Sequence, residues 1–194
     1  MKLKIGLIDY GFGNWASISK FLRDLDCKTI ISNDLETLEQ TNIILLPGVG
    51  AFKPAMQSIK LRNIDSFLKD MAKINKPIIG ICLGMQLLGQ SSEENGEEDG
   101  IGLIPAKVIK LFKGNCHIGW NDVLSENINI KNQYYFNHSY GYKVSSEFSV
   151  GTSNFENVLF TSILKYKNIV GCQFHPEKSQ VNGTKLFKYI LKDL

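Results

Sequence analysis

The stretch KPIIGICLGMQLL, residues 76–88, joins a short apolar run to a helix-favouring segment through a cysteine flanked by two glycines. Continuous hydrophobicity over residues 78–81 is typical of a strand that is covered on both faces. Glycine weakens a strand interior and marks a tight bend or the close approach of another backbone. The order Gly80, Cys82, Gly84 between a strand and a helix therefore predicts a nucleophile elbow, with the sulfur of Cys82 projecting beyond the strand end.

Similar apolar runs at residues 5–8, 29–31 and 43–46 alternate with helical periods after Asn14, a plausible N-cap, and over residues 64–71. This βαβα order predicts a parallel sheet. Shorter strand-like runs follow Gly100, at residues 108–112, 134–136, 142–144, 158–163 and 169–174, and an amphipathic helix closes the chain. We expect one α/β domain over residues 1–194, with an open, mixed, mostly parallel sheet, helices on both faces, and extra antiparallel strands in the second half.

The composition excludes several classes of protein. The net charge of +3 is spread over 22 basic and 19 acidic residues, so no nucleic-acid partner is expected. No run of ~18 apolar residues predicts a membrane span, and the N-terminal apolar stretch is too short for a secretory signal. We expect a cytoplasmic protein with four reduced cysteines. The acidic segment SSEENGEEDG, residues 91–100, reads as an exposed loop.

A nucleophilic Cys82 requires a base, and the chain contains only three histidines. His175 follows the last strand-like run, and Glu177 lies two residues further on. Side chains of an extended segment alternate with a period of two, and Pro176 favours extended backbone at His175, so Glu177 could orient the imidazole. This predicts a triad of Cys82, His175 and Glu177.

Other interpretations of these three residues remain open at this point. Cys82 could be a small buried hydrophobic residue, and the segment of His175 could be an ordinary strand end. The three side chains could also bind zinc, although the chain has no chelate-spaced pair of Cys or His. We therefore predict no metal and no cofactor.

Several motifs together resemble the class I (triad) glutamine amidotransferases. GICLGMQLL resembles the family's nucleophile segment, GCQFHPEKSQ its His-x-Glu segment, and LLPGVGAF, residues 45–52, its oxyanion loop. Within that family, the motifs DYGFGN, HIGWN and HSY resemble in order and spacing those of the glutaminase subunits of imidazole glycerol phosphate synthases, over nearly the whole chain.

The resemblance implies hydrolysis of L-glutamine to glutamate and ammonia, with ammonia channelled to a (β/α)8-barrel cyclase partner in histidine biosynthesis. It further implies low basal activity, because the oxyanion loop resembles a switch that is poorly formed until the partner binds its own ligand. It implies roles in the oxyanion site for Val49, Gly50 and Leu83, in substrate binding for Gly48, Gln86, Glu94, His138 and Ser139, and in the partner interface for Trp120 and Asn121.

The chain also departs from the usual pattern of this subunit, for example at Cys116, where a proline is customary, and at Trp15, Ala106 and Gly141. These departures leave open a paralogous subunit that feeds ammonia to another synthase, such as one making amidino-sugars for surface glycans. A scaffold protein without chemistry and a cysteine peptidase are alternatives from other classes. Trp120 could equally be a core residue.

Overall fold

The computed structural model describes residues 2–114 and 116–193. The elements of these residues, in chain order, are β1 (Lys4–Ile8), α1 (Trp15–Asp24), β2 (Lys28–Ser32), α2 (Leu35–Glu39), β3 (Ile43–Leu46), α3 (Phe52–Leu61), α4 (Ile64–Lys73), β4 (Ile78–Ile81), α5 (Leu83–Leu87), β5 (Ser91–Ser92), β6 (Glu98–Asp99), β7 (Lys107–Lys110), β8 (His117–Val123), β9 (Asn132–His138), β10 (Tyr140–Gly141), β11 (Ser149–Phe155), β12 (Val158–Tyr166), β13 (Ile169–Cys172), the 3-10 helix η1 (Pro176–Lys178) and α6 (Gln180–Asp193).

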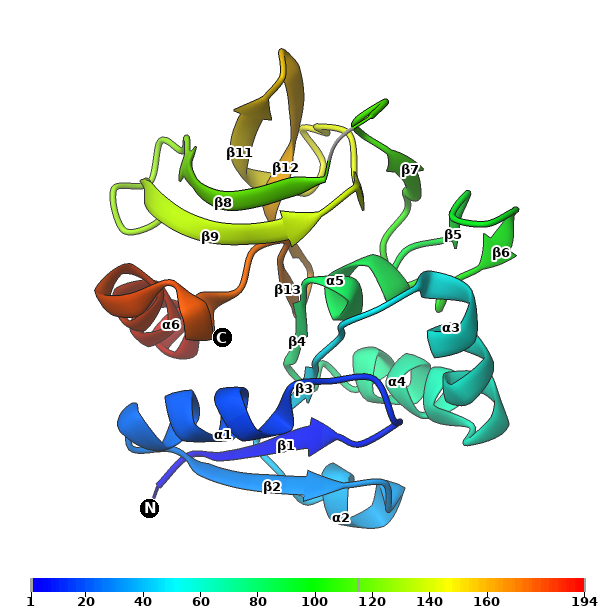
Figure 1. The fold of residues 1–194 in the computed structure, drawn as a ribbon. Helices are drawn as coiled ribbons and strands as arrows, with labels where there is room; N and C mark the ends of the chain where they lie inside the picture. Colours follow the sequence, from blue (N-terminus) through cyan, green and yellow to red (C-terminus); the bar gives the residue numbers. More distant parts are fainter. Residues whose placement is uncertain (1, 115, 194) are drawn as a thin grey trace.

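A seven-stranded sheet in the order β11-β12-β13-β4-β3-β1-β2 forms the centre of the molecule (Figure 1). The strands β13, β4, β3, β1 and β2 are parallel, whereas β12 and β11 are antiparallel additions at one edge. The predicted mixed, mostly parallel sheet with antiparallel strands from the second half is therefore confirmed.

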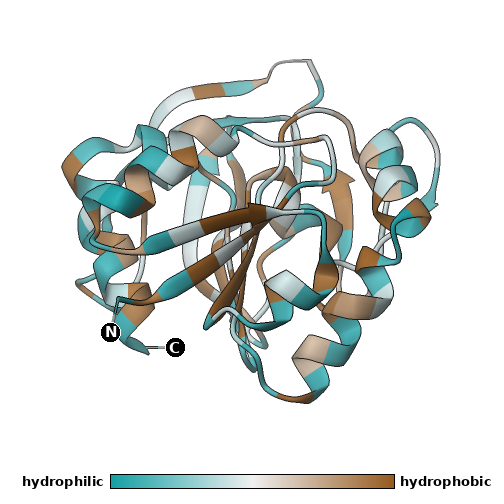
Figure 2. Ribbon diagram, turned by 90° about the horizontal axis from the view of Figure 1, so that it is seen from below, coloured by the Kyte–Doolittle hydropathy of each residue, from teal (hydrophilic) through white to brown (hydrophobic). Residues whose placement is uncertain are grey.

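Helices cover both faces of this sheet, which explains why its strands are apolar without alternation. In β3, Ile43 and Leu45 pack in one buried cluster with α1 and α6, while Ile44 and Leu46 pack in a second cluster with α2, α3, α4 and α5. Figure 2 shows hydrophobic segments along the central strands and more hydrophilic segments on the surrounding helices. No helix within residues 2–114 and 116–193 is long and apolar enough to cross a membrane.

The predicted helix after Asn14 begins where expected, because the Asn14 side chain accepts a hydrogen bond from the Ser17 N–H at 3.3 Å. The second half of the chain differs more from the prediction, which placed its additional strands in the main sheet. Its strands form two further sheets, a ribbon of β8 and β9 and a four-stranded sheet in the order β10-β7-β5-β6. The ribbon lies beyond the carboxyl ends of β4 and β13 (Figure 1).

Two local predictions were wrong. Residues 91–100 are not simply an exposed loop, because β5 pairs with both β6 and β7, and Ser91 and Ser92 are buried. Residues 142–144 are not a strand, because their backbone makes only an isolated bridge between Lys143 and Phe160. The Tyr142 hydroxyl lies 3.0 Å from the Met85 carbonyl and 2.9 Å from the Gln86 carbonyl, which holds this segment against α5.

Candidate active site

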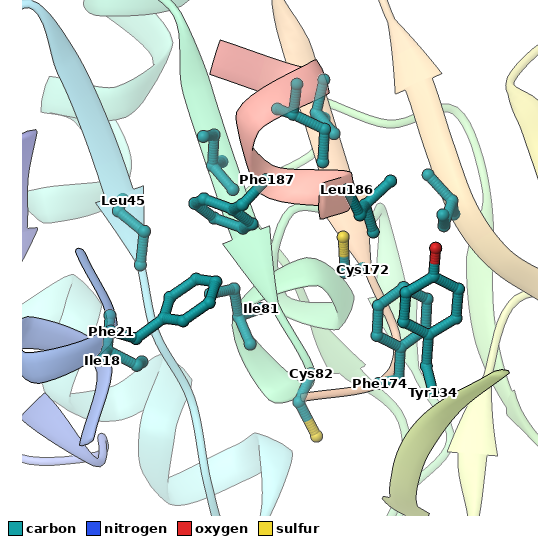
Figure 3. Packing of buried hydrophobic residues seen from close by; sticks show 14 of the residues in the cluster. Ile18, Phe21, Leu45, Ile81, Cys82, Tyr134, Cys172, Phe174, Leu186 and Phe187 are labelled. Atoms are coloured by element: carbon teal, nitrogen blue, oxygen red, sulfur yellow. The ribbon is translucent and has the colours of Figure 1, made fainter. Parts of the chain in front are cut away.

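The elbow at Cys82 has a strained backbone at the sheet's carboxyl edge. Cys82 has φ 54° and ψ −114°, between the end of β4 and the start of α5. An L-residue reaches this region only when its surroundings impose it, at a cost of about 1–3 kcal/mol. Figure 3 shows the Cys82 sulfur pointing away from the labelled core side chains, whereas the Cys172 sulfur points into the core near Leu186. The backbone thus presents the Cys82 sulfur, as the glycine pattern predicts.

The glycines are required because the elbow packs against other backbone. A Cβ atom at Gly84 would lie 2.0 Å from the Leu46 carbonyl oxygen, and one at Gly80 would lie 2.7 Å from the Cα of Met85. A Cβ at Gly48 would lie 2.4 Å from the Gly84 nitrogen. The end of β3, the loop at Gly48 and the elbow are therefore in direct backbone contact.

His175 reaches Cys82 because β13 and β4 are neighbouring parallel strands. Cys172 pairs with Ile81, and the Cys82 N–H donates to the Cys172 carbonyl at 2.7 Å. The chain then continues past the sheet edge to His175, which lines one pocket with Cys82. The charge of Cys82 is close enough to raise the pKa of the His175 imidazole. Two residues separated by more than 90 positions thus meet at the same edge of the sheet.

The imidazole of His175 also contacts Glu177, whose side chain is 1% exposed, with Nδ1 2.9 Å from Oε1. The expected geometry was wrong in one respect, because the chain does not stay extended. His175 has extended backbone, as the following proline favours, but Pro176–Lys178 form η1. The 3-10 turn brings the Glu177 carboxylate back to the ring. The other oxygen of Glu177, Oε2, is buried without a hydrogen-bond partner among the described residues.

The charges around the His175 imidazole favour its protonated form. Burial alone lowers the pKa of His175, but the charge of Cys82, the hydrogen bond with Cys82 and the Glu177 carboxylate together raise it to about 10. By contrast, burial raises the pKa of the Cys172 thiol, and the Glu177 charge raises it further. The pocket therefore suits an imidazolium beside the sulfur of Cys82, while Cys172 stays a neutral core thiol.

The pocket around Cys82 has a volume of about 260 Å³. Most of the predicted oxyanion and substrate residues line it. Its lining residues are Val49, Gly50, Cys82, Leu83, Gln86, Glu94, Asn137, His138, Ser139, Tyr140 and His175. A larger cavity of about 550 Å³ lies near Leu124 and Tyr189, but neither cysteine nor histidine lines it, so it offers no Cys–His pair.

Four predicted residues do not line this pocket, among them Glu177, which lies behind the His175 imidazole. Gly48 is buried against the elbow and is not among the residues that line the pocket. Trp120 and Asn121 lie on β8, and Trp120 is 45% exposed, so it is not a core residue. The catalytic, oxyanion, substrate and interface roles of all these residues stay predictions.

The structure adds polar neighbours that the sequence interpretation missed. The Asn137 carbonyl lies 3.8 Å from the Cys82 sulfur, and Nε2 of Gln173 lies 4.0 Å from it. The amide of Gln86 donates to the carbonyl of Tyr140 at 2.8 Å and to Oε1 of Gln173 at 3.1 Å. Gln173 could have been found, because it precedes His175 by two residues and so shares its side of an extended segment.

Metal binding has no support in the described ranges 2–114 and 116–193, where no group of three or more His, Cys, Asp or Glu side chains is arranged to hold an ion.

Comparison with known proteins agrees with the motifs. The model of the family described as glutamine amidotransferase class-I matches residues 6–193. Among relatives named imidazole glycerol phosphate synthase subunit HisH, the protein of Sulfurimonas denitrificans is 37% identical, covering 97% of both chains, and that of Exiguobacterium sibiricum is 39% identical, covering 95% of this chain and 92% of its own.

Solved structures show the same fold at low sequence identity. The structure of PurLQS from Thermotoga maritima has a TM-score of 0.77 at 21% identity, covering 100% of this chain and 99% of its own. A crystal structure of a glutamine amidotransferase has a TM-score of 0.79 at 16% identity, covering 97% of both chains. The family match and the relatives, both over nearly the full length, establish that this chain belongs to the class I glutamine amidotransferases.

Proposed function

We propose that the chain is the glutaminase subunit of an imidazole glycerol phosphate synthase, acting in the cytoplasm in histidine biosynthesis. It hydrolyses L-glutamine to glutamate and ammonia, and the ammonia passes to a (β/α)8-barrel cyclase. The observation that carries this proposal is the pocket shared by Cys82 and His175, with Glu177 2.9 Å behind the imidazole. The names of the relatives support the same assignment.

The chemistry follows from the positions of the three side chains. The Cys82 thiolate attacks the carboxamide carbon of glutamine, and the resulting oxyanion collapses to break the C–N bond. The imidazolium of His175 gives its proton to the departing ammonia, which leaves a γ-glutamyl thioester. Water then adds to the thioester carbon while His175 takes its proton, and the C–S bond breaks to release glutamate. Glu177 holds the ring and stabilises its charge throughout.

The oxyanion receives hydrogen bonds from backbone N–H groups. The N–H of Leu83, at the start of α5, is one donor. The second comes from the exposed segment of Val49 and Gly50, where Gly50 has φ 104°. Both ends of this segment are fixed, because the Tyr10 hydroxyl donates to the Pro47 carbonyl at 2.7 Å and the Phe52 N–H donates to Glu94 at 2.9 Å. Only the peptide units between these anchors are free to turn when the partner activates the enzyme.

The polar head of glutamine lies between two walls of the pocket. Glu94 binds the α-ammonium group from one side, while His138 and Ser139 form the other wall. Both amide hydrogens of Gln86 are used within the protein, so its carbonyl oxygen remains to accept a hydrogen bond from the substrate.

Membership in a synthase implies a second subunit, and β8 offers the surface for it. Ile118 is 61% exposed and Trp120 is 45% exposed on this strand. Trp120 is an aromatic anchor on the exposed face, and such an anchor, followed in the chain by Asn121, suits an interface that must exclude water around an ammonia passage. The cyclase barrel is the partner we assign to this face.

A glutaminase assay with purified candidate barrel subunits, with and without their nucleotide ligands, tests the assignment. We expect the histidine-pathway barrel with its ligand to raise turnover above the basal level. If it does not, and a synthase for amidino-sugars does, the pathway is wrong. A glutamine-mimicking diazo ketone should label Cys82, whereas a peptidase would ignore it. Cys82→Ala should abolish synthesis from glutamine and leave synthesis from free ammonia intact.

A further inference from the structure

A chain of side-chain hydrogen bonds runs from the surface strand β8 to the pocket wall. Nδ2 of Asn121 lies 3.2 Å from Nε2 of His117, and Nδ1 of His117 lies 3.1 Å from Nε2 of His138. Nδ1 of His138 lies 2.9 Å from the carbonyl oxygen of Tyr140. We call Asn121, His117, His138 and the Tyr140 carbonyl the histidine chain.

Only one set of hydrogen positions satisfies the histidine chain. A carbonyl can only accept, so Nδ1 of His138 carries the hydrogen. Burial lowers the pKa of His138 to about 3 and that of His117 to about 4, so both rings are neutral at physiological pH. Nε2 of His138 must then accept from Nδ1 of His117, and Nε2 of His117 must accept from Asn121. The other amide hydrogen of Asn121 goes to the Asn154 carbonyl at 3.0 Å.

The ring of His117 is held firmly in this position. It is 2% exposed and stacks between Phe136 and Phe155, with centroid distances of 4.6 Å and 4.2 Å and interplanar angles of 21° in both cases. A phenylalanine would fill this aromatic stack equally well. What histidine adds is one donor and one acceptor on opposite sides of the ring, which is what the histidine chain uses.

The histidine chain ends on an atom that the pocket depends on. The Tyr140 carbonyl also accepts from Nε2 of Gln86 at 2.8 Å, and Gln86 in turn contacts Gln173 beside the Cys82 sulfur. His138 and Gln86 therefore share one acceptor, and the position of His138 affects how Gln86 is held.

We propose that His117 is a positioning residue, which fixes the tautomer of His138 and the place of the Tyr140 carbonyl, and which connects this wall to Asn121 on the strand that we assign to the partner interface. The inference rests on the proposed function for the identity of the substrate and for the partner interface on β8. A change at Asn121, such as contact with a partner, reaches the pocket through the hydrogen bonds of His117.

Nitrogen NMR of the imidazole rings tests the hydrogen positions without any assay of activity. At pH 7 we expect neutral rings, protonated at Nδ1 in both His117 and His138. A ring of His138 protonated at Nε2, or an imidazolium, would overturn the proposal. This measurement stands even if the chain shows no glutaminase activity with any barrel protein, an outcome that would reject the proposed function instead.

Two substitutions separate hydrogen bonding from packing. His117→Phe keeps the aromatic stack and removes both hydrogen bonds, and we expect the KM for glutamine to rise about five- to tenfold with little change in kcat. His117→Asn places an amide donor near the position of Nδ1, so it should restore much of the KM. If both variants raise the KM equally, the hydrogen bond donated by Nδ1 of His117 does not have the proposed role. Ile190→Val, in the core away from the pocket, controls for a loss of stability.

A double-mutant cycle tests the connection to β8. We expect Asn121→Ala to raise the KM for glutamine in the wild-type background. It should have no further effect in His117→Phe, because that variant already lacks the hydrogen bonds that join Asn121 to His138. If the two effects multiply, Asn121 acts independently of His117 and the proposed connection is wrong.

Discussion

Nδ1 of His175 lies 2.9 Å from Oε1 of Glu177, although the chain turns into a 3-10 helix between the two residues. The contact survives this turn because the short helix folds the carboxylate back onto the ring. Oε2 of Glu177 is buried and has no hydrogen-bond partner in the described part of the chain, so the carboxylate is compensated mainly by the imidazolium.

Glu177→Gln removes the charge and keeps the shape of the side chain. Since the carboxylate raises the pKa of His175, the substitution should lower that pKa and weaken the imidazolium that donates to ammonia. We expect kcat to fall by about 10² to 10⁴. NMR titration of His175 and steady-state kinetics measure the two effects. Glu36→Gln, an equal charge change at an exposed position on α2, should alter neither.

Cys82 and Cys172, two buried cysteines at the ends of β4 and β13, should behave in opposite ways. Cys82→Ala should abolish glutaminase activity. Cys172→Ala, which truncates a fully buried side chain in the core, should cost about 1 kcal/mol of unfolding free energy and leave the chemistry in place. Loss of activity in the Cys172 variant at a temperature where it is fully folded would contradict the assignment of the nucleophile.

The strain at the elbow can be measured on the same residue. Because Cys82 has φ 54° and ψ −114°, Cys82→Gly should unfold at higher denaturant concentration than Cys82→Ala, with a difference of about 1 kcal/mol. Glycine is ordinarily the less stable of the two residues. Equal stabilities, or a more stable alanine variant, would show that the elbow is unstrained.

The fold near the site was predictable because its strands are buried on both faces. The runs at residues 43–46 and 78–81 coincide with β3 and β4, since a parallel strand covered by helices reads as continuous hydrophobicity. The helix α2 has only five residues, too few for a periodic signal, and α3 carries Pro54 in its first turn, where proline is tolerated but reads as a break.

The acidic segment at residues 91–100 contains a hairpin, and the Asn-Gly pair within it could have predicted the turn. Asn95 and Gly96 have φ 58° and 97°, the left-handed geometry that Asn-Gly favours in tight hairpin turns. The strands on either side have two residues each, and pairing with β7 is what buries Ser91 and Ser92. Such a tertiary contact leaves no trace in local composition.

The site itself was only partly predictable. Cys82 and His175 could each be placed at a strand end, but their meeting depends on β13 lying next to β4, which no local pattern determines. The exposure of Trp120 likewise depends on the β8 and β9 ribbon standing apart from the main sheet.

Glu94 and Glu93 offer a matched pair of carboxylates in one loop. Glu94 accepts from the Phe52 N–H at 2.9 Å and lines the pocket, whereas Glu93 accepts from the Lys110 N–H at 2.7 Å outside it. Glutamine at either position still accepts the backbone hydrogen bond. We expect Glu94→Gln to raise the KM for glutamine by about tenfold or more through the lost charge. Glu93→Gln should leave it unchanged, and equal KM values for the two variants would remove Glu94 from the substrate site.

The buried histidines make stability depend on pH in a defined direction. Burial lowers the pKa of His117 to about 4 and that of His138 to about 3, below the ordinary value near 6.5 of the unfolded chain. Between the lowered pKa of each histidine and pH 6.5, the unfolded state therefore binds more protons than the folded state. Neither residue reduces the free energy of unfolding above pH 6.5, and both reduce it as the pH falls from 6.5 towards 4. His175, whose pKa is raised, is protonated in both states over this range and adds no slope.

His117→Phe should therefore flatten the decline of stability in acid. Each lowered histidine contributes at most roughly 1.4 kcal/mol per pH unit below pH 6.5, so removing one titrating ring should reduce the slope by up to this amount. Urea unfolding between pH 7 and pH 4.5 measures the free energy for both proteins, and the carboxylates, present in each, cancel in the difference. Parallel curves for the two proteins would mean that His117 takes up its proton in the folded state, in conflict with the neutral, hydrogen-bonded ring that the structure shows.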